Sequence, residues 1–593
     1  MRMSLAVLML LGVATAAGQA VDATTLQGKV LLGYQGWFRC PGGGPLGSNW
    51  SHWAGGTPTA ATLQIDMYPD LREFDLDELC VVPNMTIGAE LARLFSSGSS
   101  KTVDRHFRWM QQYGLDGVLL QRFVTDIRGN RGGGDVVLKN VMAAALRSGR
   151  VFAIEYDISG ANAATVEADL RSDWNYLVEG LGVTAHPGYL RHEGKPVVGI
   201  WGIGLNDTRH PPADPAAALR LITWFREEAK VFYLGGTPAY WRALSNDAAT
   251  DRRWTDVYRA MDGIQPWTVG RYTNVAGVDR WRTTQIQPDL AATAGTKQVY
   301  MPVIFPGFSW YNLNRTAAQN QIPRNRGEFL WRQAFNARAA GAETLKIAMF
   351  DEVNEATSIF KVAPKRENAP DQGYWLTLDA DGFTLPSDWY LRLAGEIAAG
   401  FREAKGLAAS LPTNPGPWGD LAIGLEREKL APESMVVATG MQEELASLVM
   451  IDSTGLSRVA TVLSVSSKQV RFLVPAGLAP GGAVLVATGV DGTVVYGGVE
   501  VGTVAPALFE GAVKGRSVEF YGTGIRGRSS LEAVQCTVDG VAVAVVYAGA
   551  QGGYPGLDQV NVELPESFVA SGPSTVVLTV DGVAAAPFSL AIL

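Results

Sequence analysis

The feature that most constrains the fold is a regular alternation of short apolar runs with helical patterns between residues 28 and 405. The runs are rich in β-branched or aromatic residues, and most end in glycine, proline or polar residues, as buried strands do. They are Val30–Phe38, Gly117–Phe123, Val151–Ile158, Pro196–Ile203, Val231–Gly236, Gly263–Val269, Val299–Phe305 and Leu345–Phe350. Parallel strands need crossover helices between them, so these strand–helix units predict a parallel α/β sheet.

The number of units decides between two arrangements of such a sheet. Eight strand–helix units are the number that closes into a (β/α)8 TIM barrel. An open, doubly wound sheet is the alternative, and it is typically marked by a glycine-rich phosphate loop after an early strand. The nearest glycine cluster, Gly132-Gly133-Gly134, has the pattern of a plain loop before a helix. We therefore expect residues 21–405 to form the barrel.

The first 20 residues have the pattern of an export signal. Arg2 supplies the positive start, Leu5 to Val13 form a short apolar run, and Ala14-Thr15-Ala16 and Gly18-Gln19-Ala20 offer cleavage sites. The apolar run is too short for a permanent membrane helix, and no later segment approaches twenty apolar residues. We expect a soluble mature protein without a membrane span that is secreted, periplasmic or at the cell surface.

A change of composition follows the barrel. Residues 406–418 are rich in proline, glycine and small residues, and we assign residues 406–429 to a linker. Few contacts are expected to cross such a boundary, so a chain that ends near Lys405 is expected to fold alone. Beyond residue 430, short strands rich in valine, glycine and threonine replace the helical patterns.

An internal repeat divides this C-terminal region. The segment QVRFLVP from Gln469 recurs as QVNVELP from Gln559, and Asp491-Gly492 recurs as Asp581-Gly582. The repeat predicts two small Ig-like β-sandwiches, at residues 430–505 and 506–593. The second resembles, through YAGAQGGYPGLDQVNVELP, a C-terminal domain that recurs on large secreted bacterial proteins. That resemblance implies an attachment or spacer module, and a carbohydrate-binding module is the alternative.

Charge and cysteine content narrow the classes of partner and chemistry. The net charge is −8 with scattered lysine and arginine, which argues against nucleic acid as a partner. Cys40 and Cys80 lie in one region and can pair, whereas Cys536 alternates with apolar neighbours and is expected in a buried strand. Five histidines without CxxC or HExxH spacing predict neither a zinc site nor a His-based triad, and we expect no metal and no cofactor.

In a TIM barrel the active site forms at the C-terminal ends of the strands. Those ends carry aromatic, carboxylate and amide side chains, which suit a sugar because rings stack on its C–H faces while polar groups meet its hydroxyls. Core packing is the alternative for each aromatic. The candidate substrate-binding residues at these ends are Tyr34, Trp37, Glu155, Tyr156, Asp157, Trp267 and Trp310.

The segment FDEVNEAT after the last predicted strand carries three carboxyl groups within five residues: Asp351, Glu352 and Glu355. Cleavage of a glycosidic bond needs one carboxyl group to protonate the leaving oxygen and another to assist at the sugar. Neighbouring acids repel one another, so one pKa should be raised, as a general acid requires. An acidic first turn of a helix is the alternative. Glu352 and Glu355 are the candidate catalytic pair, and Asp351 is a candidate substrate-binding or tuning residue.

These motifs together resemble glycoside hydrolase families 71 and 99 over roughly residues 28–400. Family 99 carries an E-x-x-E segment followed by Gly-Thr after its last barrel strand, and here that segment is EVNEAT from Glu352. FPGFSW from Phe305 resembles the PGY-type segment after strand seven. Glu155-Tyr156 resembles a Glu-Pro-Tyr at strand three, and Tyr34 with Trp37 resembles an opening Tyr-x-x-Trp.

The resemblance implies a (β/α)8 fold and a metal-free reaction. Family 99 cleaves α-mannosides internally with retention, and family 71 cleaves α-1,3-glucan. In family 99 the first glutamate acts as a base on the substrate's own 2-hydroxyl, giving a 1,2-anhydro sugar, and the second is the acid/base. By position those roles fall on Glu352 and Glu355. The sequence departs from the family pattern at Ala356 for Gly, Val353 for an aromatic, and Asn354 for His or Tyr.

Two hypotheses of function follow from the sequence. The first is a secreted, monomeric glycoside hydrolase that acts on a polysaccharide or glycan, as an endo-acting, retaining enzyme on α-mannoside-like substrates or as an α-1,3-glucanase-like hydrolase. The second is a non-catalytic surface or matrix protein whose barrel binds glycan and whose sandwiches tether it. Release of reducing sugar from a polysaccharide panel separates the two hypotheses.

Overall fold

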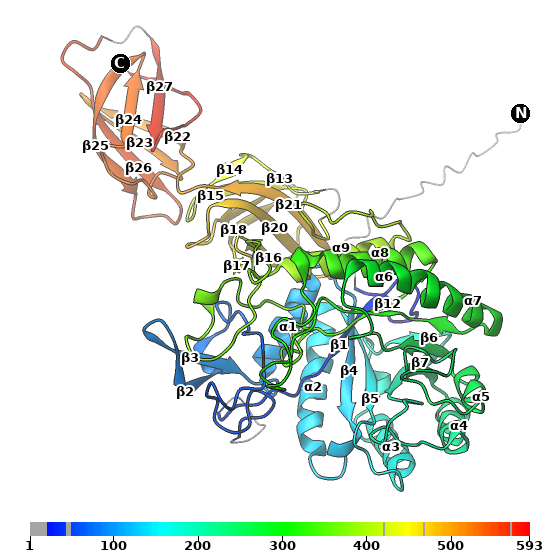
Figure 1. Cartoon of the computed structure of the whole chain (residues 1–593). Coiled ribbons are helices and arrows are strands. Elements are labelled where there is room, and N and C mark those ends of the chain that lie inside the picture. The colour runs from blue at the N-terminus through cyan, green and yellow to red at the C-terminus, as the bar shows by residue number, and fades with distance from the viewer. Residues whose placement is uncertain (1–19, 43–48, 419–420, 467–468, 570–571, 593) are drawn as a thin grey trace, which may run out of the picture.

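The computed structural model describes residues 20–42, 49–418, 421–466, 469–569 and 572–592 (Figure 1). An α/β part comes first, and two β parts follow it along the chain. The assigned export signal lies outside the described residues except for Ala20. Within the described ranges, no helix has the length and apolar character needed to cross a membrane.

The α/β part is built on a curled parallel sheet whose two edges meet. Pairing runs in the order β10, β9, β8, β7, β5, β4, β1, β12, β11, and only Met301 and Pro302 separate β10 from β11. The sheet therefore closes on itself as a TIM-like barrel, as the sequence predicts. Its strands are β1 (Val30–Tyr34), β4 (Gly117–Phe123), β5 (Val151–Asp157), β7 (Lys195–Trp201), β8 (Phe232–Thr237), β9 (Gly263–Pro266), β10 (Val299–Tyr300), β11 (Val303–Ile304) and β12 (Leu345–Ile347).

Helices cover the outside of this sheet (Figure 1). The Ser99 hydroxyl accepts a bond from the Thr102 N–H and so caps α1, and Asp214 caps α4 ahead of Pro215 at its first position. Proline suits that position because its missing N–H would have no partner in the helix. The α-helices are α1 (Ser100–Gln112), α2 (Arg131–Ser148), α3 (Val166–Asn175), α4 (Pro215–Thr223), α5 (Trp254–Arg259), α6 (Val275–Trp281), α7 (Gln287–Thr296), α8 (Glu328–Ala340) and α9 (Trp389–Arg402).

The long connection between β1 and α1 forms a separate layer at one side of the barrel. It contains the hairpin of β2 (Leu79–Ile87) and β3 (Glu90–Phe95). A disulfide joins Cys40 to Cys80 and so ties this hairpin to the segment that follows β1. A second short hairpin pairs β6 (Arg191–His192) with β7.

The first β part packs two antiparallel sheets into a β-sandwich. One sheet has the order β13, β15, β19, β18 and the other β14, β21, β20, β16, β17, with β14 pairing in parallel. Apolar side chains such as Val436, Phe472 and Leu485 form its own core. The strands are β13 (Gly424–Leu425), β14 (Lys429–Leu430), β15 (Met435–Thr439), β16 (Leu445–Ile451), β17 (Ser457–Val459), β18 (Thr461–Ser466), β19 (Gln469–Leu473), β20 (Gly481–Gly489) and β21 (Val494–Val501).

The second β part is also antiparallel, but its strands pair in one continuous path, β22, β23, β26, β25, β24, β27, β28, with β29 on β27. It has a core of its own around Val518, Phe520 and Val560. The two copies of the sequence repeat occupy matching places, because β19 and β26 each precede a hairpin turned at an Asp-Gly pair. The strands are β22 (Ala507–Lys514), β23 (Ser517–Thr523), β24 (Val534–Val538), β25 (Val541–Ala550), β26 (Asp558–Glu563), β27 (Pro573–Val580), β28 (Val583–Ala584) and β29 (Phe588–Ala591).

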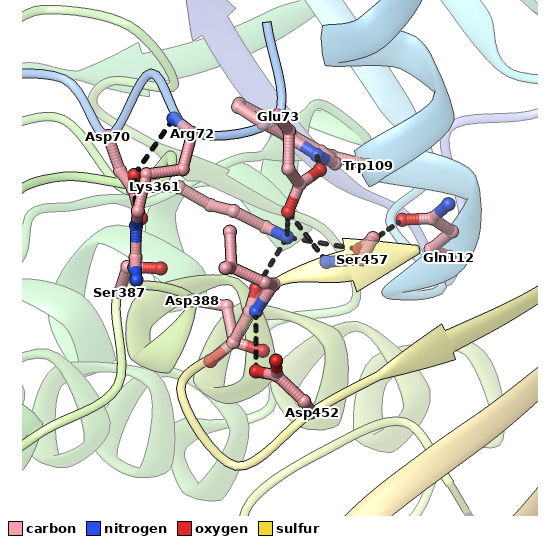
Figure 2. Close-up of polar contacts among 12 residues, drawn as sticks. Asp70, Arg72, Glu73, Trp109, Gln112, Lys361, Ser387, Asp388, Asp452 and Ser457 are labelled. Carbon is pink, nitrogen blue, oxygen red and sulfur yellow. Dashed lines mark hydrogen bonds and ion pairs between the residues drawn. The ribbon is translucent and has the colours of Figure 1, made fainter. Parts of the chain in front are cut away.

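The first β-sandwich is docked on the barrel through a buried interface (Figure 2). The Lys361 ammonium, 1% exposed, donates to Glu73 at 2.6 Å, to the Gly455 carbonyl at 2.7 Å and to the Ser457 hydroxyl at 3.1 Å. Glu73 also accepts the Ser457 N–H at 2.7 Å. Val494 and Tyr496 belong to the same buried apolar cluster as the barrel core. The expectation that few contacts cross this boundary is therefore wrong.

Candidate active site

The loop after β12 carries the acidic segment and is fixed to the end of β1. Asp351 is fully buried, and its two carboxylate oxygens accept the N–H groups of Gln35 at 2.8 Å and Gly36 at 2.9 Å. Burial raises the pKa of Asp351 to about 6, against the lowering effect of those bonds. Asp351 thus fixes the loop after β12 to the backbone that follows β1. This corrects the expectation that Asp351 lies among the substrate contacts.

Glu352 is held from two sides. The Gln35 side-chain amide donates to one carboxylate oxygen at 2.8 Å, and the Thr357 hydroxyl donates to the other at 2.7 Å. Burial raises the pKa of Glu352, and the nearby charge of Glu355 raises it further. A carboxyl group with a raised pKa can carry or take up a proton near neutral pH.

Glu355 differs from Glu352 in its surroundings. It is half-buried, and no hydrogen bond to its carboxylate is formed by the residues that the structure describes. Burial raises the pKa of Glu355, while the positive charge of Arg209 acts in the opposite direction. The Ser309 N–H donates to the Glu355 backbone carbonyl at 3.0 Å, so the backbone is fixed while the side chain stays open to a ligand.

Both glutamates line a cavity of about 380 Å³ at the C-terminal ends of the barrel strands. Its volume lies in the roughly 300–1,000 Å³ range of small-molecule sites. Of the residues predicted for substrate contact, it contains Trp37, Asp157 and Trp267. The full lining is Gln35, Trp37, Gln121, Phe123, Asp157, Ser159, Trp201, Arg209, His210, Trp267, Lys346, Met349, Glu352 and Glu355.

Four other predicted contact residues do not line this cavity. Tyr34 and Tyr156 are fully buried, and their hydroxyls lie 2.9 Å from His106 Nδ1 and from Asp173 Oδ2 respectively. Glu155 is buried beneath the cavity, where it accepts bonds from Gln121 and Lys346. Trp310 is half-buried and packs against Phe308. Burial thus corrects the expectation that Tyr34, Tyr156 and Glu155 face the substrate, and a substrate contact by Trp310 stays a prediction.

Lys346 is a cavity residue that the sequence analysis did not single out. It projects from β12, is almost fully buried, and its ammonium lies 2.5 Å from Glu155, 3.1 Å from the Gln265 side-chain oxygen and 5.5 Å from the centre of the Trp267 ring. A charged residue within the apolar last strand, β12, is the sequence feature that could have identified Lys346. Lys346 and Glu155 give the floor of the cavity a paired charge next to an aromatic wall.

Three further lining residues come from loops, where strand patterns give no guidance. Ser159 follows β5, and Arg209 and His210 follow β7. Ser159 Oγ lies 2.9 Å from His210 Nε2, and His210 Nδ1 lies 2.7 Å from Asp207. The sequence analysis did not expect this hydrogen-bonded group, because its three residues come from two loops far apart in the sequence. Among the described residues, no group of three or more His, Cys, Asp or Glu side chains is placed so that it could hold a metal ion.

Comparison with known proteins gives distant structural matches. No family model and no curated protein matches the sequence. The GH99 endo-α-mannosidase from Bacteroides thetaiotaomicron, solved with BIS-TRIS propane, is similar at 16% identity and a TM-score of 0.47, over 64% of this chain and 99% of that chain. A second structure of a GH99 endo-α-mannosidase from this organism gives the same identity and TM-score, over 65% and 100%.

A more distant match is an endo-β-1,4-mannanase double mutant from Cellulomonas fimi. Its identity is 12% and its TM-score 0.28, over 65% of this chain and 86% of that chain. These structural neighbours are glycoside hydrolases, and the first two carry the family number whose motifs the sequence resembles. With TM-scores below 0.5, they carry no inference about this chain's activity.

Proposed function

We propose that this protein is a glycoside hydrolase that cleaves glycosidic bonds in a polysaccharide or glycan. The observation that carries the proposal is that Glu352 and Glu355, both with raised pKa values, line one cavity together with Trp37, Trp201 and Trp267. Carboxyl groups that can exchange a proton near neutral pH are what hydrolysis of a glycoside needs. Aromatic rings on the cavity wall supply stacking surfaces for sugar rings.

We assign the two glutamates different roles. Glu352 is fixed by Gln35 and Thr357 and so is suited to act at one defined place, as the base on the substrate's 2-hydroxyl. Glu355 has no such restraint and is suited to meet the leaving oxygen as the general acid/base. The assignment follows the resemblance to family 99, which also supports endo-acting, retaining cleavage of α-mannoside-like substrates.

We also propose that the protein acts outside the cytoplasm. The Cys40–Cys80 disulfide supports this location, because disulfides persist in oxidising compartments. The signal-like pattern of residues 1–20 points the same way. In that location the protein would encounter the polysaccharide or glycan that we propose as its substrate.

Substitution of each glutamate by glutamine tests the proposal. General acid–base assistance contributes roughly 10²–10⁴-fold, so Glu352→Gln and Glu355→Gln should each slow release of reducing sugar from a natural glycan by at least that factor. Glu343→Gln, at an exposed position before β12, is the matched control and should leave the rate unchanged. The panel should include α-mannan and α-1,3-glucan, and thermal melting should confirm that each variant is folded.

A substrate with fluoride as leaving group separates the two roles. Fluoride departs with little protonation, so Glu355→Gln should recover much of its lost rate, whereas Glu352→Gln should not. Recovery of Glu352→Gln alone would mean that the roles are reversed. Full activity of both variants on the natural glycan would remove both residues from the mechanism. Glycan binding without release of reducing sugar by the unaltered protein would favour a non-catalytic binder instead.

A further inference from the structure

The cavity wall contains a second set of reactive side chains, which the glycosidase mechanism does not use. Ser159 lies just after β5, and Asp207 and His210 lie on the loop after β7. Ser159 Oγ lies 2.9 Å from His210 Nε2. His210 Nδ1 lies 2.7 and 2.8 Å from the two carboxylate oxygens of Asp207. A hydroxyl, an imidazole and a carboxylate in this order form the arrangement that activates a serine as a nucleophile.

The partners of His210 determine which of its two ring nitrogens carries the hydrogen. The pKa of Asp207 is lowered: partial burial acts to raise it, but bonds from the His210 ring and the Arg209 N–H outweigh that effect. An ionised carboxylate only accepts hydrogen bonds, so the Nδ1 atom that faces it must carry a hydrogen. In neutral imidazole the other nitrogen, Nε2, then has the free lone pair. His210 Nε2 is therefore an acceptor for the Ser159 hydroxyl. Burial raises the pKa of Asp157 and a side-chain bond from Ser159 acts in the opposite direction, so the Asp157 carboxylate is a second acceptor for the same hydroxyl.

The two loops that carry these residues are tied together. The Gly160 N–H donates to the Arg209 carbonyl at 2.7 Å, and the Ser159 N–H donates to Asp157 at 2.7 Å. The His210 side chain is 6% exposed and packs edge-on against Trp201, with ring centres 5.1 Å apart. The fold thus fixes the His210 ring and the two loops, while Asp207 approaches His210 from the partly exposed side.

We propose that Ser159 is a nucleophile activated by His210 and that the cavity also accepts O-acylated sugars, from which it removes the acyl group. Ser159 Oγ forms a bond to the ester carbonyl carbon while His210 Nε2 takes the hydroxyl proton. The bond between the carbonyl carbon and the sugar oxygen then breaks, and His210 returns the proton to that departing oxygen. Water, deprotonated by His210, attacks the acyl-serine and releases a carboxylic acid and free Ser159.

The negative charge that develops on the carbonyl oxygen needs a partner in the same cavity. The N–H groups of Ser159 and Gly160 are already engaged, so they do not supply it. Arg209 lines the cavity and forms no ion pair with the described residues, and its guanidinium is the cation available for this charge. The charge of Arg209 also acts on Glu355, so in this proposal the acyl group binds where Ser159 and Arg209 line the same cavity.

This activity goes beyond glycosidic cleavage and is measured without it. The full chain is treated with a biotinylated fluorophosphonate, which labels activated serines, and with p-nitrophenyl acetate, whose hydrolysis releases a coloured phenol. We expect the label on the tryptic peptide that contains Ser159 and its complete loss in Ser159→Ala. Loss of the general base should slow both reactions by roughly 10²-fold or more in His210→Gln.

A second variant and a control complete the test. The Asp207 side chain is 41% exposed, so Asp207→Asn should cost less than His210→Gln. Ser453→Ala, at a partly exposed hydroxyl of the first β-sandwich that donates to the Pro480 carbonyl, is the matched control and should keep full labelling. Absence of label on Ser159 in the folded, unaltered chain, or equal labelling of the unaltered chain and His210→Gln, would overturn the proposal.

A cysteine variant guards against misfolding of the alanine variant. Ser159→Cys should be alkylated by iodoacetamide, and adding His210→Gln should slow that reaction by about 10-fold, because the imidazole promotes the thiolate. Cys536 contributes little background, since burial raises the pKa of its thiol to about 12. Equal alkylation rates in the presence and absence of His210 would contradict the activated state of residue 159.

Discussion

The two β-sandwiches carry the two copies of one sequence repeat, yet they relate to the barrel in different ways. The first shares a buried apolar cluster with the barrel through Ile451, Val486, Val494 and Tyr496. The second has a separate core and projects away from the barrel, beyond the first (Figure 1). Matching strands and turns therefore do not imply matching roles. What distinguishes the copies is the set of side chains at the turn that meets the barrel.

The docked turn lies between β16 and β17 and approaches the loop that carries the candidate catalytic glutamates. Asp452 fixes the turn by accepting the N–H groups of Thr454 at 2.9 Å and Leu456 at 3.1 Å. Lys361, nine residues after Glu352, binds the same turn at Gly455 and Ser457. The first sandwich thus supports one end of the catalytic loop, whereas Asp351 and Thr357 hold the other part.

The second sandwich is joined to the first by a few contacts at their boundary. The Thr523 hydroxyl accepts the Met435 N–H at 2.8 Å, and Arg427 donates to the Ala505 carbonyl at 3.2 Å. Arg526 lies 3.7 Å from Glu433, whose side chain is half exposed. The pair is long and open to solvent on the Glu433 side, and ion pairs near the surface contribute about 0–1 kcal/mol. The comparison therefore predicts that changes in the first sandwich destabilise the protein much more than changes in the second.

The largest effect is expected when both sandwiches are removed. A chain that ends after Lys405 exposes the barrel surface under Tyr496 and leaves the Lys361 ammonium without its sandwich partners. Each large apolar side chain withdrawn costs roughly 1.5–3 kcal/mol, against a total stability of about 5–15 kcal/mol. We expect insoluble protein or a Tm lowered by more than ten degrees, measured by expression and thermal melting. An unchanged Tm would show that the barrel is independent of the first sandwich.

The next largest effect is expected from Lys361→Met in the full chain. Removal of one partner of a buried ion pair costs about 3–5 kcal/mol. Among the described residues, the buried Glu73 side chain would then keep Trp109 and the Ser457 N–H as donors. Denaturant unfolding measures the loss. The control is Lys514→Met, which removes an exposed pair with Glu519 in the second sandwich and should leave stability unchanged. Equal effects of the two variants would contradict the comparison.

A single methyl group should distinguish the two sandwiches at matched backbone positions. Gly455 in the docked turn has φ +84°, and an added Cβ would lie 2.4 Å from the buried Asp388 carboxylate. Gly540, in the turn between β24 and β25, has φ +78° and open space around that position. Both alanine variants strain the backbone, but only Gly455→Ala also overpacks an interface, at a further cost of about 1–3 kcal/mol. A lower Tm for Gly540→Ala than for Gly455→Ala would refute this account.

The sequence predicts the barrel well because strand signals are local. Gly117–Phe123 is found as predicted, since the run is uniformly apolar up to its polar end. Val299–Phe305 is divided into β10 and β11 at Pro302, which has no N–H to donate to a ladder. The predicted linker was harder to interpret, because its composition is that of a loop while Trp418 and Leu411 pack against the barrel cluster. The composition of a loop does not predict which surface its side chains pack against.

The candidate site is less accessible to sequence reasoning, because it depends on side-chain direction and on long-range pairing. Successive strand residues point to opposite faces, so Tyr34 is buried whereas its neighbour Gln35 reaches Glu352. The hydroxyl of Ser159 meets His210, which is 51 residues away along the chain. No local pattern contains that information. The acidic segment was found because its three carboxyl groups lie within one short stretch.

The smallest effect is expected from removal of the second sandwich alone. A chain that ends after Thr503 keeps β14 and β21 paired and keeps the whole turn that binds Lys361. Of the boundary contacts named above, it loses those of Met435, Arg427 and Glu433, where solvent can replace the missing partners. We expect the Tm of the barrel and first sandwich to change by no more than a few degrees, and the release of sugar from a soluble oligosaccharide to stay within about twofold. Loss of activity with an unchanged Tm would give the second sandwich a part in substrate binding. Loss of folding would show that the two sandwiches form one unit, and the contrast between them would then be wrong.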